Sequence, residues 1–289
     1  MSEFKVQPFL KWPGGKRWLV ANHSEWLVPA SGIHIEPFLG SGAVFFHLGP
    51  RMSVLCDSNE ELIETYVAIR DDPEGVFDRL RKHHAKHCKS YYYSLRSTMP
   101  RTPATRAAKF LYLNRTCFNG LYRVNLNGVF NVPMGSKTSV VLSTDDFVAT
   151  SKLLGEAELL VGDFETAISR SASGDFVYAD PPYTVKHNQN NFVKYNENIF
   201  SWADQVRLAQ VARDAAARGA YVMISNADHP SVRELYADRI WKCRSVSRYS
   251  RLASASEHRR STTELIVTNY LSDSGKVVAP RGQLKKRQA

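Results

Sequence analysis

The stretch at residues 32–48, GIHIEPFLGSGAVFFHL, changes character halfway along. Its first apolar residues predict a short strand near Ile33–Glu36, Pro37 and two glycines then break the pattern, and an apolar helix is predicted from Ala43. Glycines at a strand end let the backbone approach a ligand, and the N-terminus of the next helix favours an anion. A tight turn without a ligand would show the same pattern, so this stretch alone predicts a strand, a loop and a helix.

The same alternation recurs along the chain. A strand at Ser53–Cys56 leads into an amphipathic helix that runs to Arg70, and another strand and helix follow near residues 157–168. DFVYADPPY predicts a strand that ends at Pro181, and a long helix with a stop at Gly219 precedes the next strand. IWKCRSVS and TTELIVTNY are typical of a closing strand pair. Hydrophobic residues make up 43% of the 289, so we expect an α/β fold with a mostly parallel sheet and a sizeable core.

A basic block at residues 73–139 interrupts this pattern. It contains twelve Lys or Arg and two Asp or Glu, so it accounts for the whole net charge of +10. Helices are predicted near residues 74–88 and 104–114, and RVNLNGVFNVP predicts a β-hairpin with a turn at Asn127–Gly128. The expected organisation is a discontinuous domain of residues 1–72 and 140–274, an inserted, mostly helical domain of residues 73–139, and a loose basic tail of residues 275–289.

The clustered charge indicates a surface for the nucleic-acid backbone. Aromatic residues lie among the basic ones: Tyr91, Tyr92, Tyr93, Tyr112, Phe118 and Tyr122. A solvated surface that keeps the protein in solution is the alternative. A second basic stretch, Arg244 to Arg260, includes Arg248 and Arg251 and predicts a phosphate-contacting loop, although a plain solvated loop fits as well.

Several classes of protein do not fit the sequence. No apolar run approaches the roughly 20 residues of a membrane span, and the N-terminus lacks a signal-peptide core, so we expect a cytoplasmic protein without a membrane partner. The four cysteines are far apart, which suits reduced thiols. His83 and His87 have the spacing of a shared metal, but no third ligand is evident and no metal is expected.

Residues 9–19, FLKWPGGKRWL, resemble a nucleotide-binding loop only superficially. A phosphate loop requires G-x-x-x-x-G-K followed by Ser or Thr. Leu10 stands at the first glycine position and Arg17 follows Lys16, so the sequence argues against an ATPase or GTPase. The block requires another explanation.

Two acidic positions carry more specific information. Asp57 ends the strand that follows the glycine stretch, seventeen residues after Gly40, where an acid commonly binds ribose hydroxyls, so the pair suggests a nucleoside-containing cofactor. Asp180-Pro181-Pro182-Tyr183 ends another strand, and the double proline forces a rigid turn with a carboxylate, free carbonyls and an aromatic face. That set suits a planar amine, whereas a stiff loop with a capping Asp is the alternative.

Five blocks together resemble a known family. FLKWPGGK, EPFLGSG, Asp57, NGLYRVN with GVFNVPMG, and DPPY are similar, in this order, to the Dam-like DNA adenine-N6 methyltransferases of the D12 class, alpha arrangement. The resemblance covers nearly the whole chain. It implies a Rossmann-like sheet that binds S-adenosyl-L-methionine, with an inserted DNA-recognition domain.

The resemblance assigns roles to particular residues. The methionine part of the cofactor would be held by Trp12, Lys16, Phe38, Gly40 and Gly42, its ribose by Asp57, and its adenine by Asp163 and Phe164, with Asp180 also at the cofactor. An ordinary core aromatic is the alternative for Trp12. In the hypothesised mechanism Asp180 and the Pro181 carbonyl accept the two N6 hydrogens of a flipped-out adenine, Pro182 completes the turn, and Tyr183 stacks on the base.

The resemblance also places a DNA-facing segment in the insertion, comprising Asn119, Leu121, Arg123, Asn125, Asn131, Pro133 and Lys137. Arg123 is the expected base reader, because a guanidinium pairs bidentately with guanine, although a phosphate-clamping or structural arginine fits nearly as well. Ser136-Lys137 stands where some GATC-methylating relatives carry Arg-Tyr, so the chain departs from them there. We expect a monomer that methylates double-stranded DNA; methylation of cytosine N4 or of RNA adenine, and a non-catalytic DNA-binding regulator, remain the alternatives.

Overall fold

The computed structural model describes residues 6–120, 122–123, 125, 129–186, 200–249 and 261–282. The chain divides into two compact units, each assembled from segments that are distant in the sequence. The first unit comprises Met1–Asn22, Gly40–Arg51 and Asp57–Val161, and the second comprises His23–Leu39, Met52–Cys56 and Gly162–Ala289.

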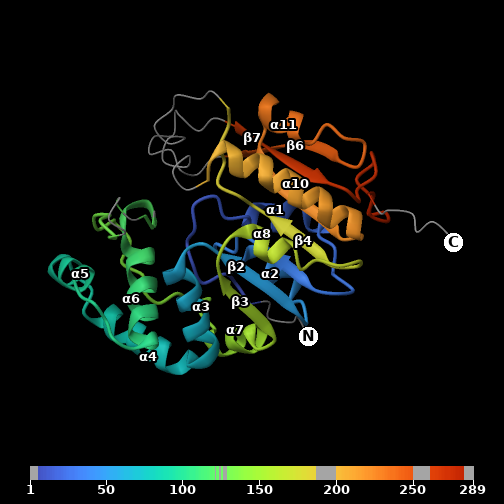
Figure 1. The fold of residues 1–289 in the computed structure, drawn as a ribbon. Helices are drawn as coiled ribbons and strands as arrows, with labels where there is room; N and C mark the ends of the chain where they lie inside the picture. The colour runs from blue at the N-terminus through green and yellow to red at the C-terminus, as the bar shows by residue number, and fades with distance from the viewer. Residues whose placement is uncertain are drawn as a thin grey trace. The chain divides into compact units, whose positions relative to one another are not determined.

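The first unit is mostly helical. Its elements are α1 (Arg17–His23), α2 (Ala43–Leu48), α3 (Glu60–Asp71), α4 (Pro73–Ala85), α5 (Lys89–Arg96), α6 (Pro103–Thr116), the 3-10 turn η2 (Phe118–Gly120), α7 (Phe147–Leu154) and strand β3 (Ala157–Val161). Helix α6 packs against α3, α4 and α5, and α7 packs against α3 and α4 (Figure 1). Tyr66, Leu80 and Leu111 are fully buried between these helices.

Side-chain caps explain where three of these helices begin. Asn59 accepts a hydrogen bond from the Leu62 N–H at the start of α3, and Asp72 caps α4 with Pro73 in its first turn. Thr102 and Thr105 form a capping box at the start of α6. The helices predicted near residues 74–88 and 104–114 are confirmed as α4 and α6.

Helix α5 is not among the predicted elements. Its sequence, KSYYYSLR, contains three adjacent tyrosines, which favour strands over helices. Tyr92 is fully buried, and its hydroxyl donates to the Val132 carbonyl over 2.9 Å, so tertiary packing overrides the local propensity. The predicted hairpin turn at Asn127–Gly128 lies outside the described residues.

The second unit contains most of the sheet. Its elements are the 3-10 turn η1 (Ser24–Trp26), β1 (His34–Glu36), β2 (Ser53–Asp57), α8 (Phe164–Ile168), β4 (Phe176–Ala179), α10 (Trp202–Arg218), β5 (Tyr221–Ala227), α11 (Pro230–Leu235), β6 (Lys242–Tyr249) and β7 (Ser261–Thr268). The described strands form a seven-stranded mixed sheet, and six of them follow the order β2-β1-β4-β5-β7-β6 within this unit. The expected Rossmann-like α/β fold is confirmed.

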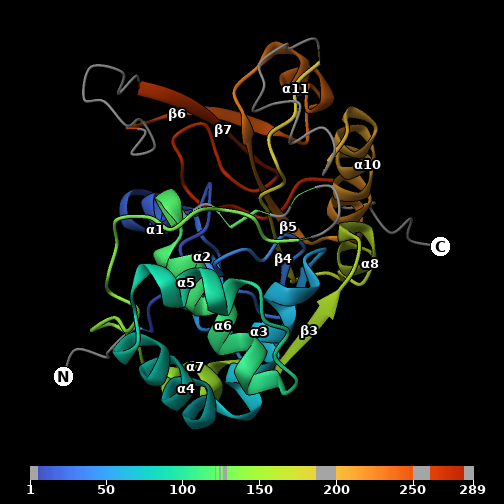
Figure 2. The ribbon, with the colours of Figure 1, turned by 90° about the vertical axis from the view of Figure 1, so that its left-hand side faces the viewer.

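Parallel pairing places the ends of β1 and β4 together. Strand β1 pairs in parallel with β2 and β4, and β4 pairs in parallel with β5, whereas β7 and β6 close the sheet in antiparallel fashion. Helix α10 packs on β5 and α8, and it ends at Gly219 with φ of +95° (Figures 1 and 2). The chain order reverses between β1 and β4, which is where ligands bind in such sheets.

Two further findings concern the described part of the chain. Within it, no helix combines the length and the apolarity that crossing a membrane requires. Within the described residues, none of Cys56, Cys88, Cys117 and Cys243 forms a disulfide bond.

Candidate active site

A tight turn of the first unit holds Lys16 in a buried position. The Gly15 N–H donates to the Trp12 carbonyl over 3.0 Å, and the Lys16 ammonium donates to the Gly14 carbonyl over 2.7 Å. Lys16 is only 3% exposed, and Gly14 has φ of +76°, a conformation that favours glycine. The PGGK stretch is therefore a backbone turn that fixes one ammonium group.

The glycine loop contacts this turn. Gly40 and Gly42 have φ of +49° and +62°, and Gly42 caps the N-terminus of α2. A Cβ atom on Gly40 would lie 2.8 Å from Cδ1 of Trp12, so only glycine lets the indole reach the loop. The Tyr66 hydroxyl supports the loop from α3 by donating to the Gly40 carbonyl over 3.1 Å.

Asp57 closes the same cluster by accepting hydrogen bonds from backbone N–H groups. The N–H groups of Gly40 and Asn59 each donate to one carboxylate oxygen of Asp57 over 3.0 Å. Burial raises the pKa of the Asp57 carboxyl group, and the backbone hydrogen bonds from Gly40, Asn59 and Ser58 oppose that rise. Three backbone donors leave the Asp57 carboxylate, with its roughly four lone-pair sites, capacity for a further hydrogen bond from a ligand.

The Trp12 turn is also attached to α6. The Lys11 N–H donates to Oδ1 of Asn114 over 3.0 Å, and Nδ2 of Asn114 donates back to the Lys11 carbonyl over 2.7 Å. Asn114 is fully buried, so its side chain ties the backbone of Lys11 to α6. The structure thus brings Trp12, Lys16, Gly40, Gly42 and Asp57 together within the first unit.

In the second unit, Phe38, which follows strand β1, belongs to a cluster of three aromatic rings. The ring of Phe38 stacks on that of Phe164 with centroids 5.4 Å apart, and both rings contact Phe200. The Arg207 guanidinium lies over the Phe164 ring, 4.3 Å from its centroid. These contacts form an apolar surface with a cationic edge.

Asp163 lies beside this cluster in a network of charges. It caps α8 through the Glu165 N–H, and both of its oxygens accept hydrogen bonds from Arg207, at 2.8 and 2.7 Å. Arg207 also contacts Asp204 and Glu165. Arg207 is not among the predicted residues, because its position on a polar helix face gives no sign that it reaches Asp163.

The Asp180–Tyr183 turn begins directly after β4. Asp180 is half-buried, and the Tyr183 hydroxyl donates to Oε2 of Glu264 on β7 over 2.7 Å. Burial raises the pKa of Tyr183, and the negative charges of Asp180 and Glu264 raise it further. Tyr183 is therefore a neutral hydrogen-bond donor, and its bond to Glu264 fixes the hydroxyl end of the ring.

Buried amide side chains also support the Asp180–Tyr183 turn. Nε2 of Gln205 lies 3.4 Å from the carbonyl oxygens of Pro182 and Thr184, and Nδ2 of Asn226 donates to Oε1 of Gln205 over 2.8 Å. Gln205 and Asn226 are fully buried, and Glu264 is 2% exposed. Sequence reasoning missed all three, although a polar residue within an apolar strand or on a buried helix face was an available signal.

The DNA-facing segment predicted in the insertion is partly described. The Phe118 N–H donates to the Pro133 carbonyl over 2.9 Å, and the Gly135 N–H donates to the Thr116 carbonyl over 2.8 Å, so these two segments run side by side. The exposed candidates are Asn119, Arg123, Asn125, Asn131, Pro133 and Lys137. Leu121, Arg251 and the side chain of Arg248 lie outside the described residues.

Within this segment, Asn119 and Asn125 have defined local roles. Asn119 has φ of +55°, which is rare for a residue other than glycine. Asn125 exchanges hydrogen bonds with Val129, donating its N–H over 2.9 Å and accepting through Oδ1 over 3.0 Å. Tyr122 packs between Phe110 and Phe130, which anchors the segment to α6.

Hydrogen bonds to tyrosines account for the two spaced histidines. His83 pairs with the Tyr91 hydroxyl over 2.7 Å, and His87 pairs with the Tyr112 hydroxyl over 2.8 Å. Among the residues that the structure describes, no group of three or more His, Cys, Asp or Glu side chains could hold a metal ion.

Comparison with known proteins shows which family the chain resembles. The profile of the D12 class N6 adenine-specific DNA methyltransferases matches residues 12–251. The chain is 37% identical over 279 residues to the type II methyltransferase M1.LlaDCHI of Lactococcus lactis subsp. cremoris, covering 93% of this chain and 97% of the relative. It is 35% identical to the type II methyltransferase M.MjaIII of Methanocaldococcus jannaschii, covering 77% and 84%, and 32% identical to the DNA adenine methylase of Escherichia coli K12, covering 80% and 84%.

The chain belongs to the D12 class of N6 adenine-specific DNA methyltransferases.

Proposed function

We propose that this protein transfers a methyl group from S-adenosyl-L-methionine to N6 of a flipped-out adenine in double-stranded DNA. The observation that carries the proposal is the Asp180–Tyr183 turn at the end of β4, which hydrogen bonds from Tyr183 to Glu264 and from Gln205 to Pro182 hold in place. It combines a half-buried carboxylate, a proline carbonyl and a fixed aromatic ring, which is the set that a planar exocyclic amine requires.

The residues of each unit fit S-adenosyl-L-methionine. In the first unit, Gly40 gives close access beside Trp12, and Asp57 has acceptor capacity for ribose hydroxyls. Lys16, Trp12 and Gly42 would hold the methionine part. In the second unit, Phe164 offers an apolar stacking surface for adenine with Asp163 at its edge, and Phe38, which stacks on Phe164, would contact the methionine part. The cofactor supplies an activated methyl group on a sulfonium.

The protein contributes positioning and electrostatics. The N6 lone pair of adenine is delocalised into the ring, so the amine is a poor nucleophile. Asp180 and the Pro181 carbonyl would each accept a hydrogen bond from one of the two N6 hydrogens, which favours tetrahedral nitrogen. As the N–C bond forms and the methyl–sulfur bond breaks, the positive charge passes to N6, where the Asp180 carboxylate stabilises it until N6 releases one proton to solvent. Pro182 keeps the turn rigid, and Tyr183 stacks on the extruded base, which holds nitrogen in line with the methyl group.

Sequence recognition is proposed to belong to the insertion at residues 73–139, which carries the net positive charge of the chain. Arg123, Asn125, Asn131 and Lys137 are exposed there. Arg123 is the proposed base reader, and Arg248 and Arg251 are proposed phosphate contacts. GATC is proposed as the recognised sequence on the family resemblance alone, and the Ser136-Lys137 departure is the feature of this chain that argues against it.

The test is methyl transfer by the purified protein. Labelled S-adenosyl-L-methionine and mixed-sequence duplex DNA should give N6-methyladenine on nucleoside analysis. Asp180→Ala should abolish transfer and leave DNA binding intact, whereas Asp214→Ala, at an exposed position of α10, should behave as wild type. Label in N4-methylcytosine, or transfer only to RNA, would overturn the base or polymer assignment; cofactor binding without transfer would indicate a non-catalytic regulator.

A further inference from the structure

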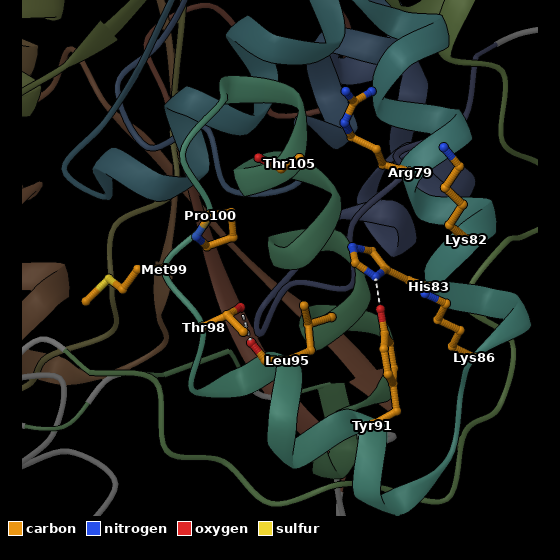
Figure 3. Close-up of a pocket in the computed structure, with 10 residues that line it drawn as sticks. All are labelled: Arg79, Lys82, His83, Lys86, Tyr91, Leu95, Thr98, Met99, Pro100 and Thr105. Atoms are coloured by element: carbon orange, nitrogen blue, oxygen red, sulfur yellow. Dashed lines mark hydrogen bonds between the residues drawn. The ribbon is translucent and has the colours of Figure 1, made fainter.

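A surface pocket on the first unit contains none of the residues proposed for cofactor binding, methyl transfer or base reading. It has a volume of about 350 Å³ and lies between α4, α5 and the start of α6 (Figure 3). Its lining residues are Arg79, Lys82, His83, Lys86, Tyr91, Leu95, Thr98, Met99, Pro100 and Thr105. Three of these ten carry a positive charge and none of the ten carries a carboxylate.

The three cations come from one helix face. Arg79 and Lys82 lie on α4 and Lys86 caps its C-terminus, so the three follow the i, i+3, i+7 spacing of one helix face, and the lysines are exposed. Asp78, an acid of the same helix, forms its ion pair with Arg81, which is not a lining residue. The positive charge at the pocket is therefore not offset by acids that line it.

The other wall is apolar and hydroxylic. Leu95, Met99 and Pro100 come from α5 and the segment that follows it, opposite the α4 cations (Figure 3). Met99 is 92% exposed, an unusual position for a large apolar side chain. A site with cations on one wall and apolar carbons on the other suits a ligand unit that has one anionic and one carbon-rich part.

The pocket is rigidly connected to the DNA-facing segment. Arg96, the last residue of α5, donates to the carbonyl oxygens of Asn131 and Val132 over 3.2 and 3.1 Å. His83 joins α4 to α5 through the Tyr91 hydroxyl. Burial lowers the pKa of His83 to about 4, so this link is neutral at physiological pH. A polymer held by the segment at residues 131–133 has a fixed path relative to α5 and α4.

We infer that this pocket binds a sugar–phosphate unit of the DNA backbone outside the recognised sequence. The phosphate lies against Lys82, Lys86 and Arg79, and the deoxyribose packs on Leu95 and Pro100. The inference rests on the proposed function for its partner, DNA, but not on methyl transfer. The site adds affinity that is independent of sequence, since phosphate contacts position a protein without reading bases.

The test is the salt dependence of DNA binding, measured by anisotropy with the full chain. Lys82→Gln/Lys86→Gln removes two cations from the pocket, and Arg81→Gln/Lys152→Gln removes two exposed cations of the same unit that do not line it. On a duplex of about 20 base pairs, two helical turns, the pocket variant should have a log K versus log salt slope shallower by about one to two units. The control variant should match wild type.

Duplex length and methyl transfer separate the possible failures. On a duplex of about 10 base pairs, one turn, wild type and pocket variant should bind alike, because the flanking backbone is absent. Equal slopes for pocket variant, control and wild type on the longer duplex would overturn the inference, as would a pocket that binds an acidic peptide while DNA slopes stay unchanged. A chain that binds DNA with the expected slopes but transfers no methyl group would overturn the proposed function alone.

Discussion

The hydrogen bond between Tyr183 and Glu264 is the contact that most directly tests how the turn is held. Its donor–acceptor distance is 2.7 Å and Glu264 is 2% exposed, so the carboxylate is a strong, desolvated acceptor. A hydrogen bond to a charged group contributes about 1.5–3 kcal/mol. Glu264→Gln keeps an acceptor of the same shape but removes the charge, so about half of that free energy should be lost.

We expect Glu264→Gln and Tyr183→Phe each to lower kcat/KM about tenfold, equivalent to about 1.4 kcal/mol. Because both changes weaken the same contact, the double variant should lose little more than either single one, with a coupling of about 1 kcal/mol in a double-mutant cycle. The loss should fall on kcat, since ring placement matters at transfer, while the affinity for S-adenosyl-L-methionine stays the same.

The assay is steady-state methyl transfer with saturating cofactor and varied duplex, accompanied by thermal unfolding of each variant. Glu234→Gln, at an exposed position of α11, is the matched control and should retain wild-type kinetics. Additive losses in the double variant, or a loss confined to KM for DNA, would refute the reasoning that Glu264 acts by fixing the Tyr183 ring.

Three further predictions concern other parts of the chain. Gly40→Ala should lower the affinity for S-adenosyl-L-methionine at least tenfold by calorimetry, because its Cβ would meet Trp12, whereas Gly162→Ala, where a Cβ meets nothing within 4 Å, should not. Arg115→Met breaks the fully buried ion pair between Arg115 and Asp145 and should lower the free energy of unfolding, measured in urea, by about 3–5 kcal/mol. Loss of an exposed ion pair should lower it far less. Because the pKa of His83 is lowered, the imidazole gains its proton near pH 6.5 in the unfolded chain but only near pH 4 in the folded protein. The free energy of unfolding should therefore fall as the pH drops from 6.5 towards 4. His83→Gln should reduce that fall by about 1 kcal/mol after solvent screening, and His84→Gln should leave it unchanged.

The strands and their ends follow closely from local sequence. Alternation of apolar strands with capped helices predicts the parallel core, and Pro181 after Ala179 marks the end of β4. Helix α5 does not follow from it, because burial of Tyr92 and its bond to Val132 outweigh the strand preference of a tyrosine run. Long-range packing decides the secondary structure of such segments, and a local sequence pattern carries no information about that packing.

The candidate site divides in the same way. Gly40 and Asp57 could be paired from their positions at successive strand ends, and the structure joins them by a hydrogen bond. Glu264 and Gln205 could not be connected with the Asp180 turn, because each is brought to it only by the fold, from β7 and α10. The roles proposed for these residues in catalysis and DNA reading remain predictions.

The most direct test of the central claim is modification-sensitive long-read sequencing of DNA from a methylation-free host that expresses this chain or its Asp180→Ala variant. The account predicts N6-methyladenine at one recurrent sequence with the wild type and none with the variant. Cytosine modification, or adenine methylation that persists in Asp180→Ala, would contradict it.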